Sequence, residues 1–136
     1  AFWQGNKLLV KRVIAGPGQW VDIDAGGVVT VDGQTLDEPY LKEVSLGNCD
    51  IELPHQVAES HWFFMGDNRA TSVDSRTASI GDVSEDQIEG QIVFRIWPLN
   101  AAGSMRQNLD KECPYYIKKY RRKRRKRKAS DTPEKE

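Results

Sequence analysis

The sequence predicts a mainly β fold built from antiparallel sheets. Runs of β-branched and apolar residues recur at short intervals, glycine-rich turns separate them, and no long amphipathic helical pattern interrupts them. The chain has 136 residues, of which 38% are hydrophobic, so we expect one domain with a modest core. No apolar run approaches the ~18 residues that a membrane-spanning helix needs.

The first half of the body contains the clearest strand patterns. Residues 7–14, KLLVKRVI, are rich in apolar and β-branched side chains and stop at a Gly-Pro-Gly turn, so they predict one strand. Residues 20–24 alternate with a period of two, and two glycines then turn the chain into residues 28–31. This pattern is typical of a hairpin, and Asp32-Gly33 marks another tight turn.

The rest of the body alternates short apolar runs with polar loops. Residues 34–61 show no sustained periodicity, and we expect short strands there at best. Residues 62–65, WFFM, predict a compact strand, and the polar residues 67–81 predict a loop. Residues 84–88 fit one helical turn with a serine cap. Residues 90–98, GQIVFRIWP, predict a further strand that the proline closes.

The formal net charge of zero conceals two opposite parts. Residues 1–117 hold 9 Lys and Arg against 17 Asp and Glu, a net charge of −8, whereas residues 118–128 hold 10 basic residues and no acid. Residues 129–136 hold 1 basic and 3 acidic residues, a net charge of −2. An acidic body with a basic tail therefore describes the chain better than neutrality does.

Composition also predicts the organisation of the chain. We expect a β domain over residues 1–99, a polar linker over 100–117 and a basic tail, disordered or helical, over 118–136. Cys49 and Cys113 form no CxxC pair and no Cys/His cluster, so a zinc site is not expected. A disulfide between them and two separate thiols both stay open. The chain begins with an alanine, and we expect it to be part of a longer protein.

Lys11 is the first candidate for chemistry. It lies inside an apolar run, where a lysine ammonium must be hydrated, paired or neutral. A desolvated lysine offers a free amine that can take a proton from a serine hydroxyl without any histidine. The plainer alternative is that Lys11 and Arg12 point to opposite faces of a strand, and that one or both face water.

Residues 66–76, GDNRATSVDSR, form the second candidate. They place several acceptor side chains and two guanidinium groups in a loop that follows an apolar strand. Asp and Arg side chains can pair through two hydrogen bonds and so hold such a loop in one geometry. The alternative is a solvated turn whose surface ion pairs contribute little to stability.

Taken together and in this order, the segments resemble the bacterial type I signal peptidase family. Its members are membrane-bound serine endopeptidases that remove secretory signal peptides, and the resemblance covers residues 7–99. KRVIAGPGQWVDI resembles the lysine box of the family, and VDGQTLDEPYLKE the segment that follows it. FFMGDNRATSVDSR resembles the Gly-Asp-Asn-Arg box, and GDVSEDQIEGQIVFRIWPL the closing strand. The resemblance implies a signal-peptidase-like β catalytic domain over residues 1–99, incomplete at its amino terminus.

The resemblance implies roles for the matching residues. Lys11 corresponds to the general base, and Ser72 corresponds to a serine whose hydroxyl orients that lysine. The other matching positions, expected to support the site structurally, are Arg12, Gly66, Asp67, Asn68, Arg69, Asp74, Ser75 and Arg76.

Two salt-bridged pairs are also implied by the resemblance, Arg12 with Asp67 and Asp74 with Arg76. The chain departs from the family pattern in turns, for example at Gln19, where Asp is common. Such departures bear on substrate preference more than on the reaction class.

The nucleophile of the family has no counterpart in this chain. In the family it lies in a Ser-X-X-Pro-type box upstream of the lysine strand, just after a transmembrane anchor, and no serine here precedes Lys11. We therefore expect the chain alone to be inactive. The resemblance implies an enzyme without metal or cofactor, monomeric, on the extracytoplasmic face of the cytoplasmic membrane. Its substrates would be preproteins with small residues at positions −1 and −3 of the signal peptide.

The basic run over residues 118–128 allows other functions. It can bind an anionic membrane surface or nucleic acid, or it can be a solvated disordered extension. A self-cleaving repressor-type protease uses the same serine–lysine chemistry, but the Gly-Asp-Asn-Arg box and the lack of a DNA-binding helix pair disfavour it. A non-catalytic module that binds nucleic acid through its tail is disfavoured by the acidic body.

Overall fold

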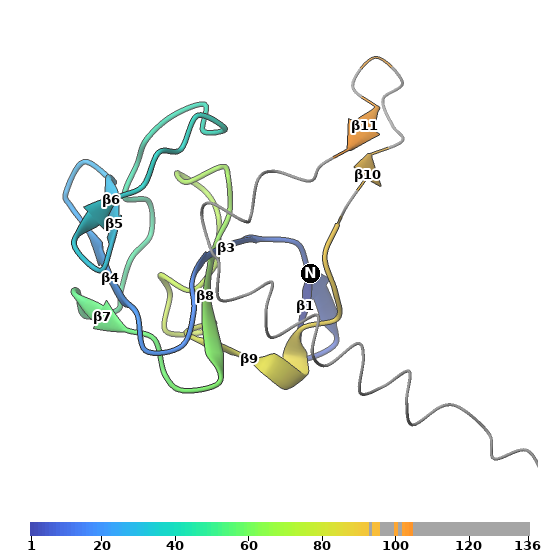
Figure 1. The fold of residues 1–136 in the computed structure, drawn as a ribbon, viewed down its shortest axis with the longest axis horizontal. Helices are drawn as coiled ribbons and strands as arrows, with labels where there is room; N and C mark the ends of the chain where they lie inside the picture. The colour runs from blue at the N-terminus through green and yellow to red at the C-terminus, as the bar shows by residue number, and fades with distance from the viewer. Residues whose placement is uncertain (93, 96–99, 101, 105–136) are drawn as a thin grey trace, which may run out of the picture. The chain divides into compact units, whose positions relative to one another are not determined.

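The computed structural model describes residues 1–92, 94, 95, 100 and 102–104. The chain divides into two compact units, Ala1–Ile92 and Val93–Glu136. The regular secondary structure of the first unit consists of short antiparallel strands and one 3₁₀-helix, which confirms the predicted mainly β fold (Figure 1). The basic tail lies outside the described residues. Within the described part, no helix has the length and apolar character required to cross a bilayer.

A four-stranded sheet has the order β6-β5-β4-β7. Its strands are β4 (Trp20–Ile23), β5 (Val29–Val31), β6 (Gln34–Thr35) and β7 (His55–Gln56). β4 and β5 form the predicted hairpin, with Val21 and Ile23 buried while Trp20 and Asp22 are exposed, as the period of two requires.

The turn between β5 and β6 depends on backbone conformation. Asp32 and Gly33 have φ values of 51° and 76°, so both lie in the left-handed region. A two-residue hairpin turn of type I′ requires positive φ at both central positions. The predicted Asp-Gly turn is therefore confirmed.

A three-stranded sheet has the order β3-β8-β9. Its strands are β3 (Arg12–Ala15), β8 (His61–Met65) and β9 (Val83–Ser84). The central strand β8 is the predicted WFFM strand, and its last four residues are buried. Phe63 and Met65 belong to the main core, whereas the ring of Phe64 packs against the ring of Phe2 with centroids 4.7 Å apart. Both faces of β8 are thus covered, which explains its continuous apolar sequence.

The prediction of one strand over residues 7–14 was wrong. The run is divided into β2 (Lys7–Leu9) and β3, which begins at Arg12. β2 pairs with β1 (Phe2–Gln4), a strand that the sequence analysis did not predict, whereas β3 pairs with β8. Because the chain changes its pairing partner at Val10 and Lys11, an unbroken apolar pattern does not give an unbroken strand.

Of the predictions for residues 67–98, the loop and the helical turn are confirmed, and the strand is wrong at its start. The polar residues 67–81 form the expected loop, and the 3₁₀-helix η1 (Glu85–Gln87) follows Ser84, whose backbone N–H donates to the Gln87 side chain at 2.9 Å. The strand predicted over residues 90–98 was wrong at its start, because residues 90–92 form no strand. In the second unit β10 (Phe94–Arg95) pairs with β11 (Gly103–Ser104), and residues 96–98 lie outside the described part.

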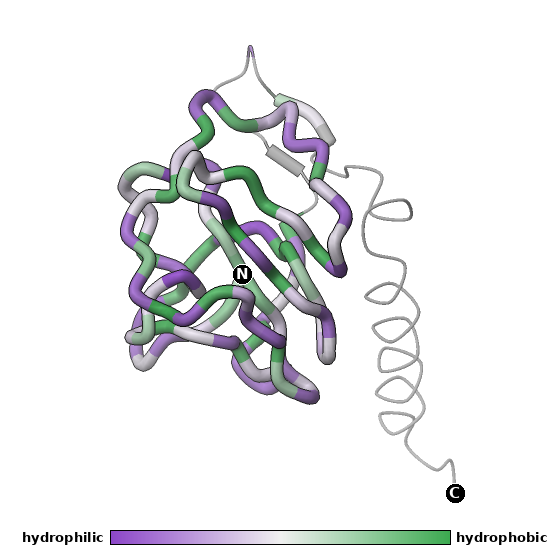
Figure 2. Tube along the Cα trace, turned by 90° about the vertical axis from the view of Figure 1, so that its left-hand side faces the viewer, coloured by the Kyte–Doolittle hydropathy of each residue, from purple (hydrophilic) through white to green (hydrophobic). Residues whose placement is uncertain are grey.

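Hydrophobic side chains from both larger sheets form the main core. Short hydrophobic stretches alternate with hydrophilic ones along the chain (Figure 2), and the inward-facing residues of the hydrophobic stretches come together. The buried cluster consists of Ile14, Ala15, Val21, Ile23, Val29, Val57, Phe63 and Met65. Removal of this apolar surface from water is the main stabilising contribution to the unit.

We predict that Val21→Ala lowers the free energy of unfolding by roughly 2 kcal/mol, because two buried methyl groups are lost and a cavity remains. Val44 offers a matched control, since it is 52% exposed. Val44→Ala should change the free energy by no more than about 0.5 kcal/mol. Urea denaturation of both variants measures the difference, and equal effects would contradict the assignment of Val21 to the core.

Candidate active site

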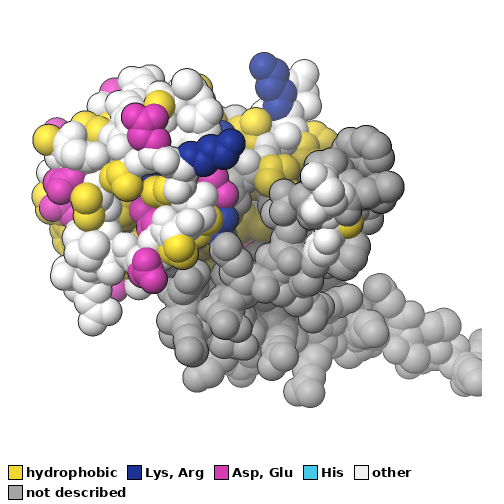
Figure 3. Space-filling model, turned by 90° about the horizontal axis from the view of Figure 1, so that it is seen from above, with side chains coloured by type: hydrophobic (Ala, Val, Ile, Leu, Met, Phe, Trp, Pro, Cys, Tyr) yellow, Lys and Arg dark blue, Asp and Glu magenta, His cyan; other side chains and the backbone are white. Residues whose placement is uncertain are grey.

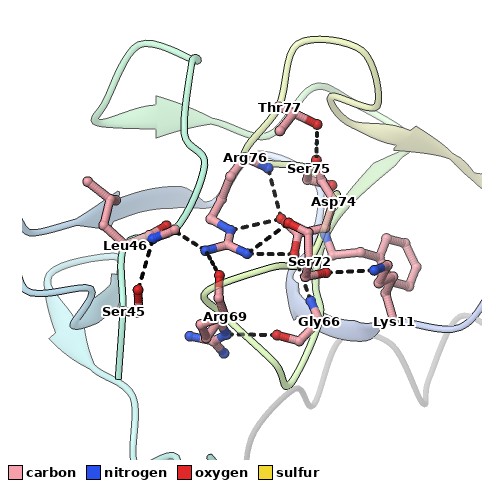
Figure 4. Close-up of polar contacts among 12 residues, drawn as sticks. Lys11, Ser45, Leu46, Gly66, Arg69, Ser72, Asp74, Ser75, Arg76 and Thr77 are labelled. Carbon is pink, nitrogen blue, oxygen red and sulfur yellow. Dashed lines mark hydrogen bonds and ion pairs between the residues drawn. The ribbon is translucent and has the colours of Figure 1, made fainter. Parts of the chain in front are cut away.

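Lys11 lies where β3 begins, directly before its first residue. In the antiparallel register of β3 and β8, Arg12 pairs with Met65, so the next position places Lys11 opposite Gly66. The half-buried Lys11 donates a hydrogen bond from Nζ to Ser72 Oγ at 2.6 Å (Figure 4). Ser72 is itself only 9% exposed. The structure therefore brings together the two residues to which the resemblance gave chemical roles.

A tight turn in the loop carries Ser72 to this position. The backbone N–H of Ser72 donates to the carbonyl of Asn68 at 3.0 Å, which closes one helix-like turn after β8. The hydroxyl then lies directly above Gly66, where a Cβ atom would come within 2.1 Å of Ser72 Oγ and 3.3 Å of Lys11 Nζ. Only glycine fits at position 66 with the lysine and serine so placed.

Asp74 and Arg76 form a fully buried ion pair on the other side of Ser72. Arg76 donates from Nε and Nη2 to the two oxygens of Asp74 at 2.8 and 2.9 Å. The Gly66 N–H donates to Asp74 Oδ2 at 2.8 Å, and Arg76 Nη1 donates to the carbonyls of Leu46 and Arg69 at 2.5 and 3.0 Å. This network connects the loop both to β8 and to the segment before β7.

Arg69 is a second buried guanidinium, and its partner is Glu38. Arg69 Nε donates to the carbonyl of Gly66 at 3.0 Å, and Nη1 and Nη2 donate to the two oxygens of Glu38 at 3.0 and 2.5 Å. Sequence analysis missed Glu38. Its only signal was the match of VDGQTLDEPYLKE to a family segment, which does not tell which acid reaches Arg69.

Arg12 and Asp67 form a pair nearer the surface. Arg12 donates from Nε and Nη2 to the two oxygens of Asp67, both at 2.8 Å. The guanidinium also lies 3.5 Å from the centre of the Tyr40 ring, a cation–π contact, and the Tyr40 hydroxyl donates to Glu38 at 2.6 Å. Tyr40 is a second residue of this site that sequence analysis missed.

Two predicted supporting residues make their hydrogen bonds with the backbone of neighbouring residues. Ser75 continues the pairing of β8, since its N–H donates to the Phe64 carbonyl at 3.0 Å and its Oγ accepts from the Phe64 N–H at 2.9 Å. Asn68 has an exposed side chain and contributes its carbonyl to the turn that carries Ser72. All of the predicted site residues therefore lie in one connected arrangement around Gly66.

Comparison with known proteins gives several matches. The family described as "Signal peptidase, peptidase S26" matches residues 3–97. A signal peptidase I of Leptolyngbya laminosa is 36% identical over 101 residues, which cover 74% of this chain and 46% of that protein. Signal peptidase IB of Staphylococcus aureus (strain Mu50) is 35% identical over 110 residues, which cover 70% of this chain and 56% of that protein.

A solved structure is also similar. A signal peptidase I from Enterococcus faecalis V583 aligns with a TM-score of 0.48 at 27% identity, over 60% of this chain and 80% of that chain. The chain spans about half the length of the curated relatives that it matches.

The pKa of Asp74 predicts how acid affects this site. Burial raises the pKa of the carboxyl, but hydrogen bonds from Arg76, Gly66 and Ser72 outweigh burial, so the pKa lies below its ordinary value of 3.8. A carboxyl with a lowered pKa in the folded state contributes stability above the unfolded-state pKa and loses it as the pH falls through the folded-state pKa. We therefore expect the free energy of unfolding to decline from about pH 4 downwards.

Asp74→Asn tests this expectation. At pH 7 the variant should be less stable by about 3–5 kcal/mol, because a buried Arg76 loses its counter-charge, and its stability should decline less below pH 4. Urea denaturation at pH 7, 4 and 3 gives both numbers. Asp37→Asn, at an exposed carboxylate, is the control and should follow the unmodified chain. Parallel pH curves for all three proteins would rule out Asp74 as the source of the acid dependence.

Proposed function

The chain belongs to the signal peptidase family, peptidase S26, and we propose that it supplies the lysine general base of a type I signal peptidase. The enzyme would be a serine endopeptidase that removes signal peptides from secreted preproteins. The hydrogen bond between Lys11 Nζ and Ser72 Oγ, in a half-buried position, is the observation that carries this proposal.

Ser72 acts as the orienting group in this proposal and not as the nucleophile. Its oxygen accepts a hydrogen bond from Lys11 Nζ at 2.6 Å, which holds the amine in place. Ser72 Oγ is also packed closely against Gly66, where a Cβ atom would lie 2.1 Å from it. By the resemblance, a second serine provides the attacking oxygen.

Lys11 then performs the proton transfers. An unprotonated amine has two N–H groups and one lone pair, and donation of one N–H to Ser72 restricts the lone pair to the two remaining directions. The lone pair accepts the proton of the attacking serine as that serine bonds to the peptide carbonyl, and the amine later returns a proton to the leaving amino group. By the resemblance, the attacking serine lies in a Ser-X-X-Pro-type box before the lysine strand, so the chain alone would not cleave peptides.

The cellular setting is part of the same proposal. The enzyme would work as a monomer on the extracytoplasmic face of the cytoplasmic membrane, on signal peptides with small residues at positions −1 and −3. The basic run over residues 118–128 would attract it to anionic lipids. The face of the body in Figure 3 carries acidic side chains and some Lys and Arg scattered among hydrophobic ones, in keeping with the acidic composition of residues 1–117 and without the continuous basic patch of a nucleic-acid footprint.

A chimera provides the test of the base. The segment of the Leptolyngbya relative that precedes its matched region is joined to the complete chain, and cleavage of a preprotein is measured. We expect the chimera to cleave and Lys11→Ala to lower kcat/KM by roughly 10²–10⁴-fold, because the proton acceptor is lost. Lys7→Ala, at an exposed lysine of β2, is the matched control and should cleave normally.

Two results would contradict the proposal. Normal cleavage by a folded Lys11→Ala chimera would remove Lys11 from the mechanism. Cleavage by the 136-residue chain without the added segment would show that the nucleophile lies within the chain. Circular dichroism and thermal unfolding of each variant distinguish loss of the base from loss of the fold.

Membrane attraction is tested separately by sedimentation with vesicles. Each basic residue near an anionic surface contributes about 1 kcal/mol, and salt weakens the attraction. The chain should therefore sediment with phosphatidylglycerol vesicles at low salt, much less at high salt, and not with neutral vesicles. Deletion of residues 118–136 should abolish binding; equal binding by the shortened chain would contradict the role of the tail. Retention of RNA at physiological salt would favour the nucleic-acid alternative.

A further inference from the structure

Gly66 lies directly against both members of the lysine–serine pair. Its lack of a side chain allows Ser72 and Lys11 to approach its Cα closely. Both of its backbone polar groups are also held, since its N–H donates to Asp74 and its carbonyl accepts from Arg69 Nε. A small displacement of Gly66 would therefore move the serine and the amine together.

The hydrogen bond from Arg69 to the Gly66 carbonyl depends on Glu38. The Arg69 guanidinium is almost completely inaccessible to water, and the carboxylate of Glu38 receives hydrogen bonds from both of its terminal nitrogens. Two parallel hydrogen bonds of this kind fix the plane of the guanidinium, and with it the direction of Nε towards Gly66. Glu38 therefore acts on Gly66 through Arg69, although Glu38 and Arg69 are 31 positions apart in the sequence.

Tyr40 connects the Glu38–Arg69 pair to the Arg12–Asp67 pair. Its hydroxyl donates to Glu38, and its ring lies under the guanidinium of Arg12, which in turn pairs with Asp67. Burial raises the pKa of the Tyr40 hydroxyl, and Glu38 raises it further, so the hydroxyl remains a donor at neutral pH. Two residues that follow Gly66, Asp67 and Arg69, are thus both connected to Glu38 and Tyr40, Asp67 through Arg12 and Arg69 directly.

We propose that Glu38 and Tyr40 are positioning residues for the reaction. They clamp Arg69 and Arg12, and through these they hold Gly66 where Lys11 and Ser72 meet. This inference rests on the proposed function, because it takes Lys11 as the general base. Neither residue touches the reacting atoms; each acts through the backbone of the loop that follows β8.

Kinetics of the chimera test the proposal. Glu38→Gln should lower kcat roughly 10²-fold, because a misplacement of catalytic groups by about 1 Å has an effect of that size. Tyr40→Phe keeps the ring and loses one hydrogen bond, so kcat should fall by roughly threefold to tenfold. KM should change by less than about threefold in both variants, since ground-state binding is not altered. Glu43→Gln, at an exposed acid of the same segment, should behave like the unmodified chimera.

A double variant separates positioning from stability. Glu38→Gln leaves a buried guanidinium without its counter-charge, so the melting temperature should fall as well. Combining it with Arg69→Gln removes that charge and should restore most of the melting temperature. We expect kcat to remain low in the double variant, because the contact of Arg69 with the Gly66 carbonyl is lost. Recovery of kcat together with the melting temperature would overturn the proposal.

Hydrogen exchange in the chain itself provides a readout without activity. The Gly66 N–H should exchange faster in Glu38→Gln than in Glu43→Gln under native conditions, because the loop that buries it is released. Unchanged exchange together with unchanged kcat would overturn the positioning role. If instead Lys11→Ala cleaves normally, the proposed function fails, whatever Glu38→Gln does. The two failures are therefore distinguishable.

Discussion

Pairing of buried charge is the constraint on which the site depends. Arg69, Asp74 and Arg76 are shielded from water, and ionised groups persist there only when counter-charges and hydrogen bonds satisfy them. Few conformations of an eleven-residue loop, residues 66–76, can meet all of these requirements at once. The conformation that does so presents the Ser72 hydroxyl to Lys11.

The register between β3 and β8 makes the meeting of the two motifs possible. Lys11 and Ser72 are separated by 61 positions in the sequence and meet because Arg12 pairs with Met65. A shift of one residue would move every side chain of β3 to the opposite face and exchange the directions of Lys11 and Arg12. The bulge between Val13 and Ala15 lies just beyond this pairing, in the part of β3 that faces the core.

Sequence patterns predicted the parts of this structure that are local. The hairpin of β4 and β5 followed from alternation, and the family followed from the order of four motifs, which the match over residues 3–97 confirms. The division of residues 7–14 was not predictable, because Lys11 marks a change of partner strand and not a change of composition. The pairing of Glu38 with Arg69 was equally hidden, since the intervening segment has no periodicity from which a contact can be inferred.

Stability and site geometry have different physical sources in this fold. Apolar burial around Phe63 stabilises the unit in proportion to the area removed from water, and many side chains of similar volume can supply it. The buried ion pairs contribute little net stability, because desolvation offsets most of their attraction, but their geometry admits few alternatives. The presence of two such pairs beside Gly66 is therefore best explained by the need to fix a loop in one conformation. The core keeps the sheets together, and the charges determine where the serine and the lysine meet.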